Sequence, residues 1–473
     1  MTRSIVARIR ARVARWPSVA IALVVAAAPA GAAAVIANMH AFSNPSGVSR
    51  TFNSRGILNP DNPFFDSLGT NERACVTCHQ AEDGWSLTPP GIRRRFAASK
   101  GLEPLFRTND GSNCGGADVS TLAARRANFS LLLTRGLIRV ELPVPADAEF
   151  FIESVDDPYG CGAGVLNASL YRRPLPATNL RFLTAVMWDG RESPGTRSLR
   201  EALLSQARDA TLGHAQGAVS PSDRELRQIV DFELNLHTAQ TGDLAAGALD
   251  ARGATGGPLP LAREPFFVGI NDPLGQNPTG AAFDPKVFTL FTAWEKGARD
   301  PRGDKRFDAG DDARADARAS IARGQALFNT HPIAIVGVGG LNDDLQVASI
   351  PGTCTTCHDT PNVGNHSVKA PLDLGLTDAV RRTADMPLYT LRNIATGDER
   401  QTTDPGRAMI SGKWKDVGRF KGPVLRGLAS RAPYFHNGFA AGLADVVNFY
   451  DDRFGMALTA SEKADLVAFL GAL

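Results

Sequence analysis

Two short stretches of this chain combine thiols and an imidazole in the same order, CVTCH at 75–79 and CTTCH at 354–358. Their reactive side chains are Cys75, Cys78, His79, Cys354, Cys357 and His358. Two thiols at this spacing can add to the two vinyl groups on one edge of a porphyrin, and the adjacent imidazole can reach its iron. Because C-x-x-C-H is the attachment signature of c-type haem, the sequence predicts two covalently bound haems.

Zinc binding and dithiol redox chemistry are the alternatives for such motifs. A structural zinc ion needs four ligands, and neither motif has a second pair of cysteines near it. One zinc site built from both pairs is conceivable, but it would leave the two matching histidines unexplained. A thioredoxin-like motif needs no histidine after its second cysteine.

The two remaining cysteines are Cys114 in GSNCGG and Cys161 in PYGCGA. Both lie in glycine-rich loop sequence, and an exported chain reaches a compartment that permits disulfides. We therefore expect Cys114 and Cys161 to form a disulfide. Two free structural thiols are the alternative.

The first 40 residues have the layout of an export signal. Five arginines between Arg3 and Arg15 precede the charge-free stretch 16–37, and small residues at 30–34 offer a cleavage site. The apolar stretch is also long enough to remain as a membrane anchor. A buried N-terminal helix is the remaining alternative. Both export predictions place the rest of the chain outside the cytoplasm.

Two similar segments indicate that the chain contains two related units. SPSDRELRQIVDFELNL follows the first haem motif, and LTASEKADLVAFLGAL follows the second. Each opens with a capping box, a hydroxyl residue followed three positions later by glutamate, which predicts the start of a helix. The boxes are Ser222 with Glu225, and Thr459 with Glu462. Apolar residues then recur at identical offsets, Ile229, Val230 and Phe232 in one segment and Leu466, Val467 and Phe469 in the other.

These units predict the domain organisation. We expect an N-terminal haem domain over 48–240, a linker or insertion rich in Gly, Pro, Ala and Asp over 241–316, and a C-terminal haem domain over 317–473. Strand-like alternation is scarce, and LIRVELPV at 137–144 is the best candidate. The predicted fold is therefore mainly α, with two cytochrome c-like haem domains and long loops.

Three further motifs carry a family resemblance. The chain reads MWDGRE at 187–192, APYFHNG at 432–438 and LADVVNFY at 443–450. These stretches resemble FWDGRA, APYFHDG and LEEVVDFY of the bacterial di-haem cytochrome c peroxidases and their relative MauG. The resemblance covers about residues 50–473. For an exported bacterial protein it implies the periplasm, either soluble after cleavage or tethered to the inner membrane.

The resemblance assigns a role to Trp188. It matches the tryptophan that lies between the two haems in the family, where an indole can relay electrons or share an oxidising equivalent. Without the resemblance, an aromatic residue before Asp-Gly would be assigned to the core.

The resemblance also implies chemistry at the first haem. In many members a loop histidine caps this haem at rest, but no histidine lies between His79 and His214. We therefore expect an open, five-coordinate first haem, as in MauG. The family moves protons with a glutamine and, ten residues later, a glutamate, whereas here Gln206 is followed by Gln216. A glutamine cannot move protons at neutral pH, so we predict that His214 takes this role while Gln206 and Gln216 shape the pocket. A surface or structural His214 is the alternative.

Tyr450 stands where the second haem of the family usually has a methionine ligand, seventeen residues after Pro433. MauG also has a tyrosine there. A tyrosinate stabilises oxidised iron, so this residue predicts a second haem of low potential that stores oxidising equivalents. Met456 is the competing ligand, and His436 is expected beside the same haem.

Calcium is a further cofactor that the resemblance implies, held by one asparagine side chain and two backbone carbonyls. The carbonyls fall on Arg431 and Pro433, but Arg173 stands in the place of the asparagine. A cation beside Ca²⁺ is unfavourable, and this substitution argues against calcium here.

Together these features predict an exported di-haem enzyme that reduces hydrogen peroxide. Its electrons would come from a small cytochrome or cupredoxin, or from side chains of a partner protein. A haem dioxygenase acting on an organic substrate and an electron-transfer cytochrome without peroxide chemistry are the alternatives. The net charge of +2 gives no indication of a nucleic-acid partner.

Overall fold

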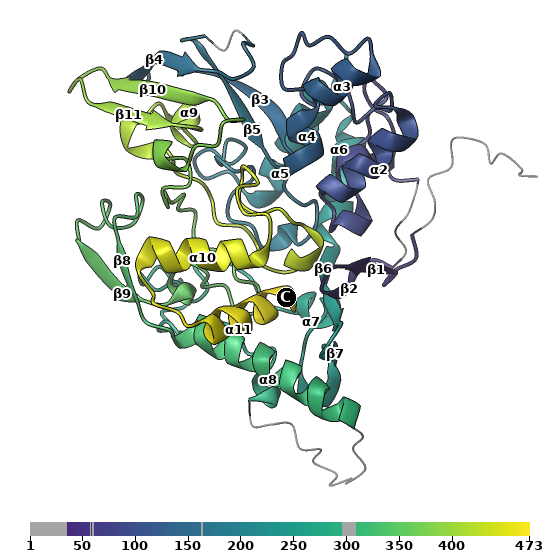
Figure 1. Ribbon diagram of the computed structural model, residues 1–473, viewed down its shortest axis with the longest axis vertical. Helices are drawn as coiled ribbons and strands as arrows, with labels where there is room; N and C mark the ends of the chain where they lie inside the picture. The colour runs from purple at the N-terminus through teal and green to yellow at the C-terminus, as the bar shows by residue number, and fades with distance from the viewer. Residues whose placement is uncertain (1–35, 57, 59–60, 162–163, 296–308) are drawn as a thin grey trace, which may run out of the picture. The chain divides into compact units, whose positions relative to one another are not determined.

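The structure is a computed structural model that describes residues 36–56, 58, 61–161, 164–295 and 309–473 (Figure 1). The predicted signal or anchor lies outside this part of the chain, except for its last residues. Within the described residues, no helix is long and apolar enough to span a membrane.

Strands are more abundant than the sequence suggested, so the mainly α prediction is wrong and the fold mixes helices with small sheets. In the described residues, one sheet has the order β1 (Ala41–Asn44), β2 (Gly47–Asn53), β6 (Leu236–Asp243), β7 (Gly247–Ala248). A second has the order β11 (Glu399–Thr402), β10 (Leu388–Asn393), β4 (Phe150–Asp156). Two two-stranded antiparallel sheets join β3 (Ile138–Pro143) with β5 (Asn167–Arg172), and β8 (Ile333–Val336) with β9 (Ser349–Gly352). The predicted strand at 137–144 is confirmed as β3.

The missed strand β6 lacks the alternation that marks a half-buried strand. The first five residues of β6, LHTAQ, are all buried although three of them are polar. Since both faces of this segment are covered, no period of two appears in its sequence. A hydroxyl pair inside the fold satisfies one of its polar side chains, where Thr238 Oγ1 lies 2.8 Å from Thr51 Oγ1.

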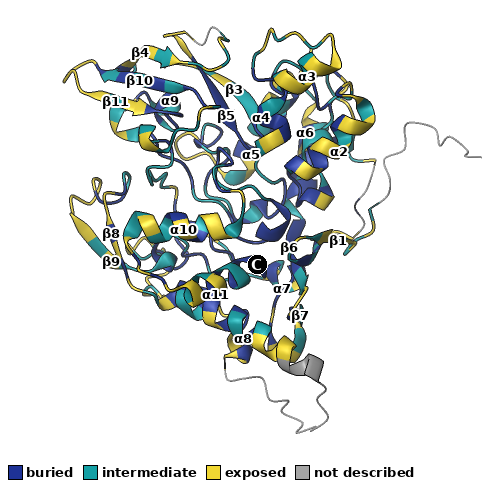
Figure 2. Ribbon diagram, in the orientation of Figure 1, coloured by how far each residue is buried: buried dark blue, intermediate teal, exposed yellow. Residues whose placement is uncertain are grey.

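The helices include the two that the repeat predicts. They are α1 (Cys75–Cys78), α2 (Pro89–Ser99), α3 (Leu122–Asn128), α4 (Ser130–Arg135), α5 (Leu199–Gly213), α6 (Asp223–Leu234), α7 (Pro258–Leu261), α8 (Ala309–Thr330), α9 (Ala408–Ser411), α10 (Leu443–Phe454) and α11 (Ala460–Gly471). Ser222 and Thr459 cap α6 and α11 through the expected boxes. Both helices bury their apolar stripe, whereas α3 is mostly exposed (Figure 2).

Two hydrophobic clusters surround the two haem motifs. Cys75 packs against a core that includes Phe64, Trp85 and Phe232 of α6. Cys354 and Cys357 pack against a larger core formed by α8, α10, α11 and the segment 246–294. The residues assigned to a linker therefore supply part of the second core, with Phe291 and Trp294 fully buried. The domain boundaries themselves stay a prediction.

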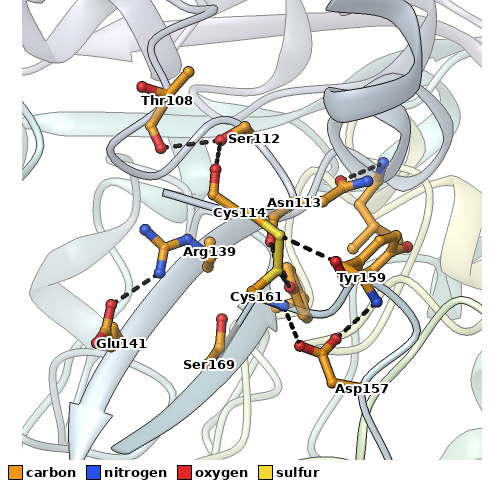
Figure 3. Close-up of a disulfide and its surroundings, with 12 residues drawn as sticks. Thr108, Ser112, Asn113, Cys114, Arg139, Glu141, Asp157, Tyr159, Cys161 and Ser169 are labelled. Atoms are coloured by element: carbon orange, nitrogen blue, oxygen red, sulfur yellow. Dashed lines mark hydrogen bonds and ion pairs between the residues drawn. A yellow bond between two sulfur atoms is a disulfide. The ribbon is translucent and has the colours of Figure 1, made fainter. Parts of the chain in front are cut away.

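The predicted disulfide between Cys114 and Cys161 is confirmed (Figure 3). It joins the loop around Ser112 to the turn at Asp157, whose carboxylate accepts hydrogen bonds from the backbone N–H of Tyr159 at 2.9 Å and of Cys161 at 2.8 Å. The disulfide therefore restrains the loop that also carries Asp110.

Candidate haem sites

Each C-x-x-C-H motif lines its own cavity. The first cavity, of about 160 Å³, contains Cys75, Cys78 and His79 in its wall. The second cavity, of about 230 Å³, contains Cys354, Cys357 and His358. Because the two cysteine pairs lie in different cavities, a single zinc site built from both is excluded.

The two motifs share one local backbone arrangement. In each, the third residue is a threonine whose hydroxyl accepts a hydrogen bond from the backbone N–H just before the first cysteine, at 3.0 Å from Thr77 to Ala74 and 3.0 Å from Thr356 to Thr353. The N–H of each histidine donates to the carbonyl of the first cysteine of its motif. This turn brings the two thiols and the imidazole to the same cavity.

A second shared feature orients the two imidazoles. His79 Nδ1 lies 3.0 Å from the carbonyl oxygen of Trp85, and His358 Nδ1 lies 2.6 Å from that of Gly364. A carbonyl can only accept, so each Nδ1 carries the proton and each Nε2 keeps its lone pair. In both sites the accepting residue is the sixth after the histidine and has a positive φ, 61° at Trp85 and 76° at Gly364.

The protonation states fit axial haem ligands. Burial lowers the pKa of His79 to about 4, partly offset by its bond to Trp85, and burial also lowers the pKa of His358. Both imidazoles are therefore neutral at pH 7, the form that binds iron. All four motif thiols are free and carry no disulfide. These thiols and the two Nε2 atoms are the residues that would hold covalent haem.

His214 lies at the C-terminal end of α5 and faces the first cavity. Its Nδ1 is 2.5 Å from Asp110 Oδ2, while the other oxygen of Asp110 pairs with the buried Arg73. Burial alone would raise the pKa of Asp110, but the bond from His214 and the charge of Arg73 hold it below its usual value. Asp110 therefore stays a carboxylate and holds the imidazole of His214 through Nδ1. The Nε2 atom of His214 does not take part in this hydrogen bond.

The backbone at His214 is also held firmly. Its carbonyl accepts hydrogen bonds from Asn71 Nδ2 at 2.8 Å and from Arg73 Nη1 at 3.1 Å. These contacts fix the backbone at His214, and both the catalytic and the structural prediction for its side chain agree with them. The sequence analysis missed Asp110 and Arg73, because neither has a spacing to His214 that marks a pair.

The two predicted pocket glutamines differ in position. Gln206 on α5 lines the first cavity. Gln216 is exposed, has a φ of 53°, and points toward Asn71, whose Nδ2 lies 3.3 Å from its Oε1. Gln216 does not line the first cavity, so its position lends no support to the predicted pocket role.

Trp188 lies beside the second cavity, and the preceding residue Met187 lines the first. The indole Nε1 donates to the carbonyl of Arg173 at 2.8 Å. The Arg173 guanidinium in turn donates to the carbonyl of Arg431 at 3.1 Å, one of the two carbonyls that the resemblance would assign to calcium. Trp188 and Met187 thus contact different cavities, and the backbone carbonyl of Arg173 fixes the indole.

Tyr450 and Met456 both line the second cavity. Burial raises the pKa of Tyr450, and the nearby thiols of Cys357 and Cys354 add to this effect. The phenol is neutral until a positive ion lies beside it. His436 is buried in the same wall and stacks on Phe420 with ring centroids 4.0 Å apart. The geometry does not choose between Tyr450 and Met456.

Glu233 is a buried carboxyl group that the sequence analysis did not single out. It lies on α6, lines the first cavity and is 6% exposed, and its Oε2 accepts no hydrogen bond from the described residues. Burial raises the pKa of Glu233 to about 8. In the aligned segments Glu233 corresponds to Leu470 of α11, which lines the second cavity.

Parts of the chain are similar to curated cytochrome-c peroxidases. Over 174 residues it is 32% identical to cytochrome-c peroxidase IdrP1 of Pseudomonas sp. (strain SCT), a match covering 33% of this chain and 40% of that protein. Over 142 residues it is 33% identical to IdrP2 of Denitromonas iodatirespirans, covering 28% of this chain and 38% of that protein. The chain spans about two fifths of the length of these relatives. The resemblance to cytochrome c peroxidases is thus confirmed over the matched part.

No protein-family model matches the chain. A MauG-like protein associated with microbial copper homeostasis aligns over 87% of this chain and 87% of its own, at 14% identity and a TM-score of 0.36. The hydrazine synthase of Kuenenia stuttgartiensis aligns over 82% of this chain and 93% of its own, at 15% identity and a TM-score of 0.30. TM-scores this low do not establish a shared fold.

Proposed function

We propose that this protein is an exported di-haem c-type peroxidase that reduces hydrogen peroxide at the first cavity. The observation that carries this proposal is the imidazole of His214, which Asp110 orients toward the cavity that holds His79. A c-type haem with an open iron position would supply the binding and cleavage of the peroxide O–O bond. The named relatives support peroxidase chemistry.

His214 is the group that moves protons in this proposal. Its Nε2 accepts a proton from incoming hydrogen peroxide and returns it to the departing oxygen, which leaves as water. Asp110 stabilises the imidazolium that forms in between, as the carboxylate does in a catalytic triad. Gln206 contributes an amide to the same cavity wall and cannot exchange protons.

The two electrons needed to reduce one peroxide to two waters come from a donor. We propose that His358 and Tyr450 would hold a haem in the second cavity, which would supply storage of oxidising equivalents, and that Trp188 connects this cavity to the first. The donor is a small electron-transfer protein or oxidisable side chains of a partner protein. The position of Trp188 beside one cavity and Met187 beside the other supports this connection.

A specific observation also favours an electron-transfer cytochrome. His214 has the same arrangement as His79, with Nδ1 bonded to an oxygen and Nε2 free of that bond. In this second candidate, His214 would help His79 to hold the first haem, and peroxide would not reach its iron.

One experiment separates the two candidates. The purified holoprotein is titrated with hydrogen peroxide while the absorption bands of both haems are followed, and electron paramagnetic resonance records the resting state. A high-spin first haem whose spectrum changes at stoichiometric peroxide supports the peroxidase. Two low-spin haems that do not respond to peroxide would establish the electron-transfer cytochrome instead.

A further inference from the structure

One wall is common to the two cavities. Five of its residues are apolar, namely Pro174, Leu175, Pro176, Pro423 and Val424. The other two residues that line both cavities are the cations Lys421 and Arg431. They are 8% and 9% exposed, so an otherwise apolar wall holds two buried positive charges.

Neither cation has an anionic partner among the described residues. Arg431 donates from Nε and Nη2 to the backbone carbonyls of Gly427, Val424 and Arg426, which leaves its Nη1 without a described acceptor. The described part of the chain also offers no hydrogen-bond acceptor to Lys421 Nζ. The buried Arg173 adjoins this pair and bonds only to carbonyls, so it adds positive charge.

Buried charges without partners are costly, and proteins pair them or keep them in water. Burial lowers the pKa of Lys421 to about 8 and that of Arg431 to about 10. The missing negative charge must therefore come from whatever fills the cavities. Since this wall lines both cavities, an anion in the first cavity and an anion in the second can contact the same two cations.

Haem brings such anions. Each porphyrin carries two carboxylate side groups in addition to the vinyl groups that the cysteines bind. Lys421 and Arg431 line the same cavities that contain the attachment thiols of Cys75 and Cys354. We propose that Lys421 and Arg431 form one anion site shared by the two cavities, which binds the carboxylate side groups of both haems.

This inference rests on the proposed function only for the presence of two haems. A shared cation disfavours the more positive, oxidised form of each haem, so its removal lowers both reduction potentials. In Lys421→Met, each one-electron reduction equilibrium is expected to fall about tenfold, which corresponds to about 59 mV. Lys421→Arg keeps the charge and should stay near wild type.

The matched control is Lys369→Met, which removes an exposed lysine that lines neither cavity. The measurement is a spectroelectrochemical titration of both haems, with haem content checked in every variant. Unchanged potentials in Lys421→Met, or a shift equal to that in Lys369→Met, would overturn the shared site. Potentials of the wild type that depend on added phosphate would show a free anion in the site and would also overturn it.

If the Lys421→Met variant does not fold or cannot be purified, a second measurement on the wild type tests the same site. Infrared difference spectra of reduced and oxidised wild type, with haem labelled by ¹³C at its carboxylates, should show deprotonated carboxylates that respond to both haems. Absence of any labelled carboxylate signal would refute the site. Neither measurement uses peroxide. If the holoprotein did not react with peroxide but Lys421→Met still shifted both potentials, the peroxidase proposal would be wrong and the shared anion site would stand.

Discussion

His214 and Asp110 act together in the proposed proton transfer. Replacing His214 by alanine removes the proton carrier and should slow the reaction with peroxide about 10²-fold. Asp110→Asn keeps the shape but not the charge that stabilises an imidazolium, so we expect a smaller loss and an altered pH profile. Stopped-flow spectroscopy of the first haem measures both rates.

Gln216→Ala is the control for these variants, because Gln216 is exposed and does not line the cavity. Its peroxide rate should match wild type. An unchanged rate in His214→Ala would remove His214 from the mechanism. A low-spin to high-spin change of the first haem in that variant would identify His214 as an iron ligand.

Tyr450 and Met456 are the two candidate ligands of the proposed second haem, since both line the cavity of His358. If Tyr450 is the ligand, Tyr450→Phe should change the electron paramagnetic resonance signal of the second haem. Tyr450→Met should raise its reduction potential, because a thioether favours reduced iron. Met456→Leu should leave the signal unchanged. The opposite pattern, with only Met456→Leu altering the spectrum, would assign the ligand to Met456.

Glu233 should make folding stability depend on pH. Its pKa is 4.5 in an exposed setting and about 8 in this fold. Below pH 4.5 both states are protonated, whereas between 4.5 and 8 only the folded state keeps the proton. The folded state therefore loses up to about 1.4 kcal/mol per pH unit across this window, and the loss is complete above the folded pKa.

The replacement Glu233→Leu copies Leu470 of the related helix and removes this cost. Guanidinium unfolding of the holoprotein at pH 6, 7 and 9 should show a stabilisation by the variant that grows with pH. Equal differences at all three pH values would mean that Glu233 has an ionised partner when haem is bound.

The residues that sequence could predict are those fixed by local spacing. The motif at 75–79 and its copy at 354–358 fold the same way because their hydrogen bonds close within a few residues. Asp110 and Lys421 depend on contacts with residues distant in the chain. Asp110 bonds to His214, and Lys421 lies in the same cavity wall as Pro174. No spacing in the sequence marks residues that meet in this way.

At the scale of elements, the crossing of α8 and α11 depends on Gly324. A methyl group added there would lie 2.0 Å from the carbonyl oxygen of Asp465, closer than atoms can approach. Gly324→Ala should therefore push the helices apart and cost about 1–3 kcal/mol of unfolding free energy, measured by denaturant titration. Ser320 and Arg323 bond to the Asp465 side chain at the same crossing, at 2.6 and 2.7 Å, and would be displaced too.

Gly213→Ala in α5 is the matched control, because a methyl group there meets nothing within 4 Å. Helix propensity alone should make this variant neutral or slightly more stable. Equal effects of the two substitutions would show that the close crossing does not limit stability.

Helices and strands were predictable where their own sequence carries a local pattern of capping residues or apolar positions. Capping boxes and apolar stripes predicted α6 and α11, because these signals are local and repeated. Strands such as β6 and β10 were missed for different reasons. β6 is covered on both faces. In β10, burial alternates along LYTLRN, but the buried face includes Asn393 and the partly exposed face includes Leu388, so apolar and polar residues do not alternate with it.

For the whole molecule, the disulfide between Cys114 and Cys161 closes a loop with a sequence separation of 47 residues. Loop-closure entropy assigns such a link about 4 kcal/mol of stability. The double variant Cys114→Ser and Cys161→Ser should unfold at lower denaturant concentration by about that amount or less. Because Asp110 lies close before Cys114 in the chain, the peroxide rate of this variant should also fall, while the reduction potential of the second haem should not. An unchanged peroxide rate would show that Asp110 holds its position without the disulfide.

The six cysteines also set a requirement on how this protein matures. In the proposed di-haem protein, four must remain thiols until each has joined a porphyrin, whereas Cys114 and Cys161 must together give up two electrons and two protons to an oxidant. Cysteines at C-x-x-C spacing are themselves prone to close on one another under the conditions that link Cys114 to Cys161. Production of the protein therefore requires a reductant that keeps the cysteines of 75–78 and 354–357 as thiols. An oxidant must at the same time form the disulfide between Cys114 and Cys161. A host cell that supplies only the oxidant should yield colourless protein, in which disulfides join Cys75 to Cys78 and Cys354 to Cys357.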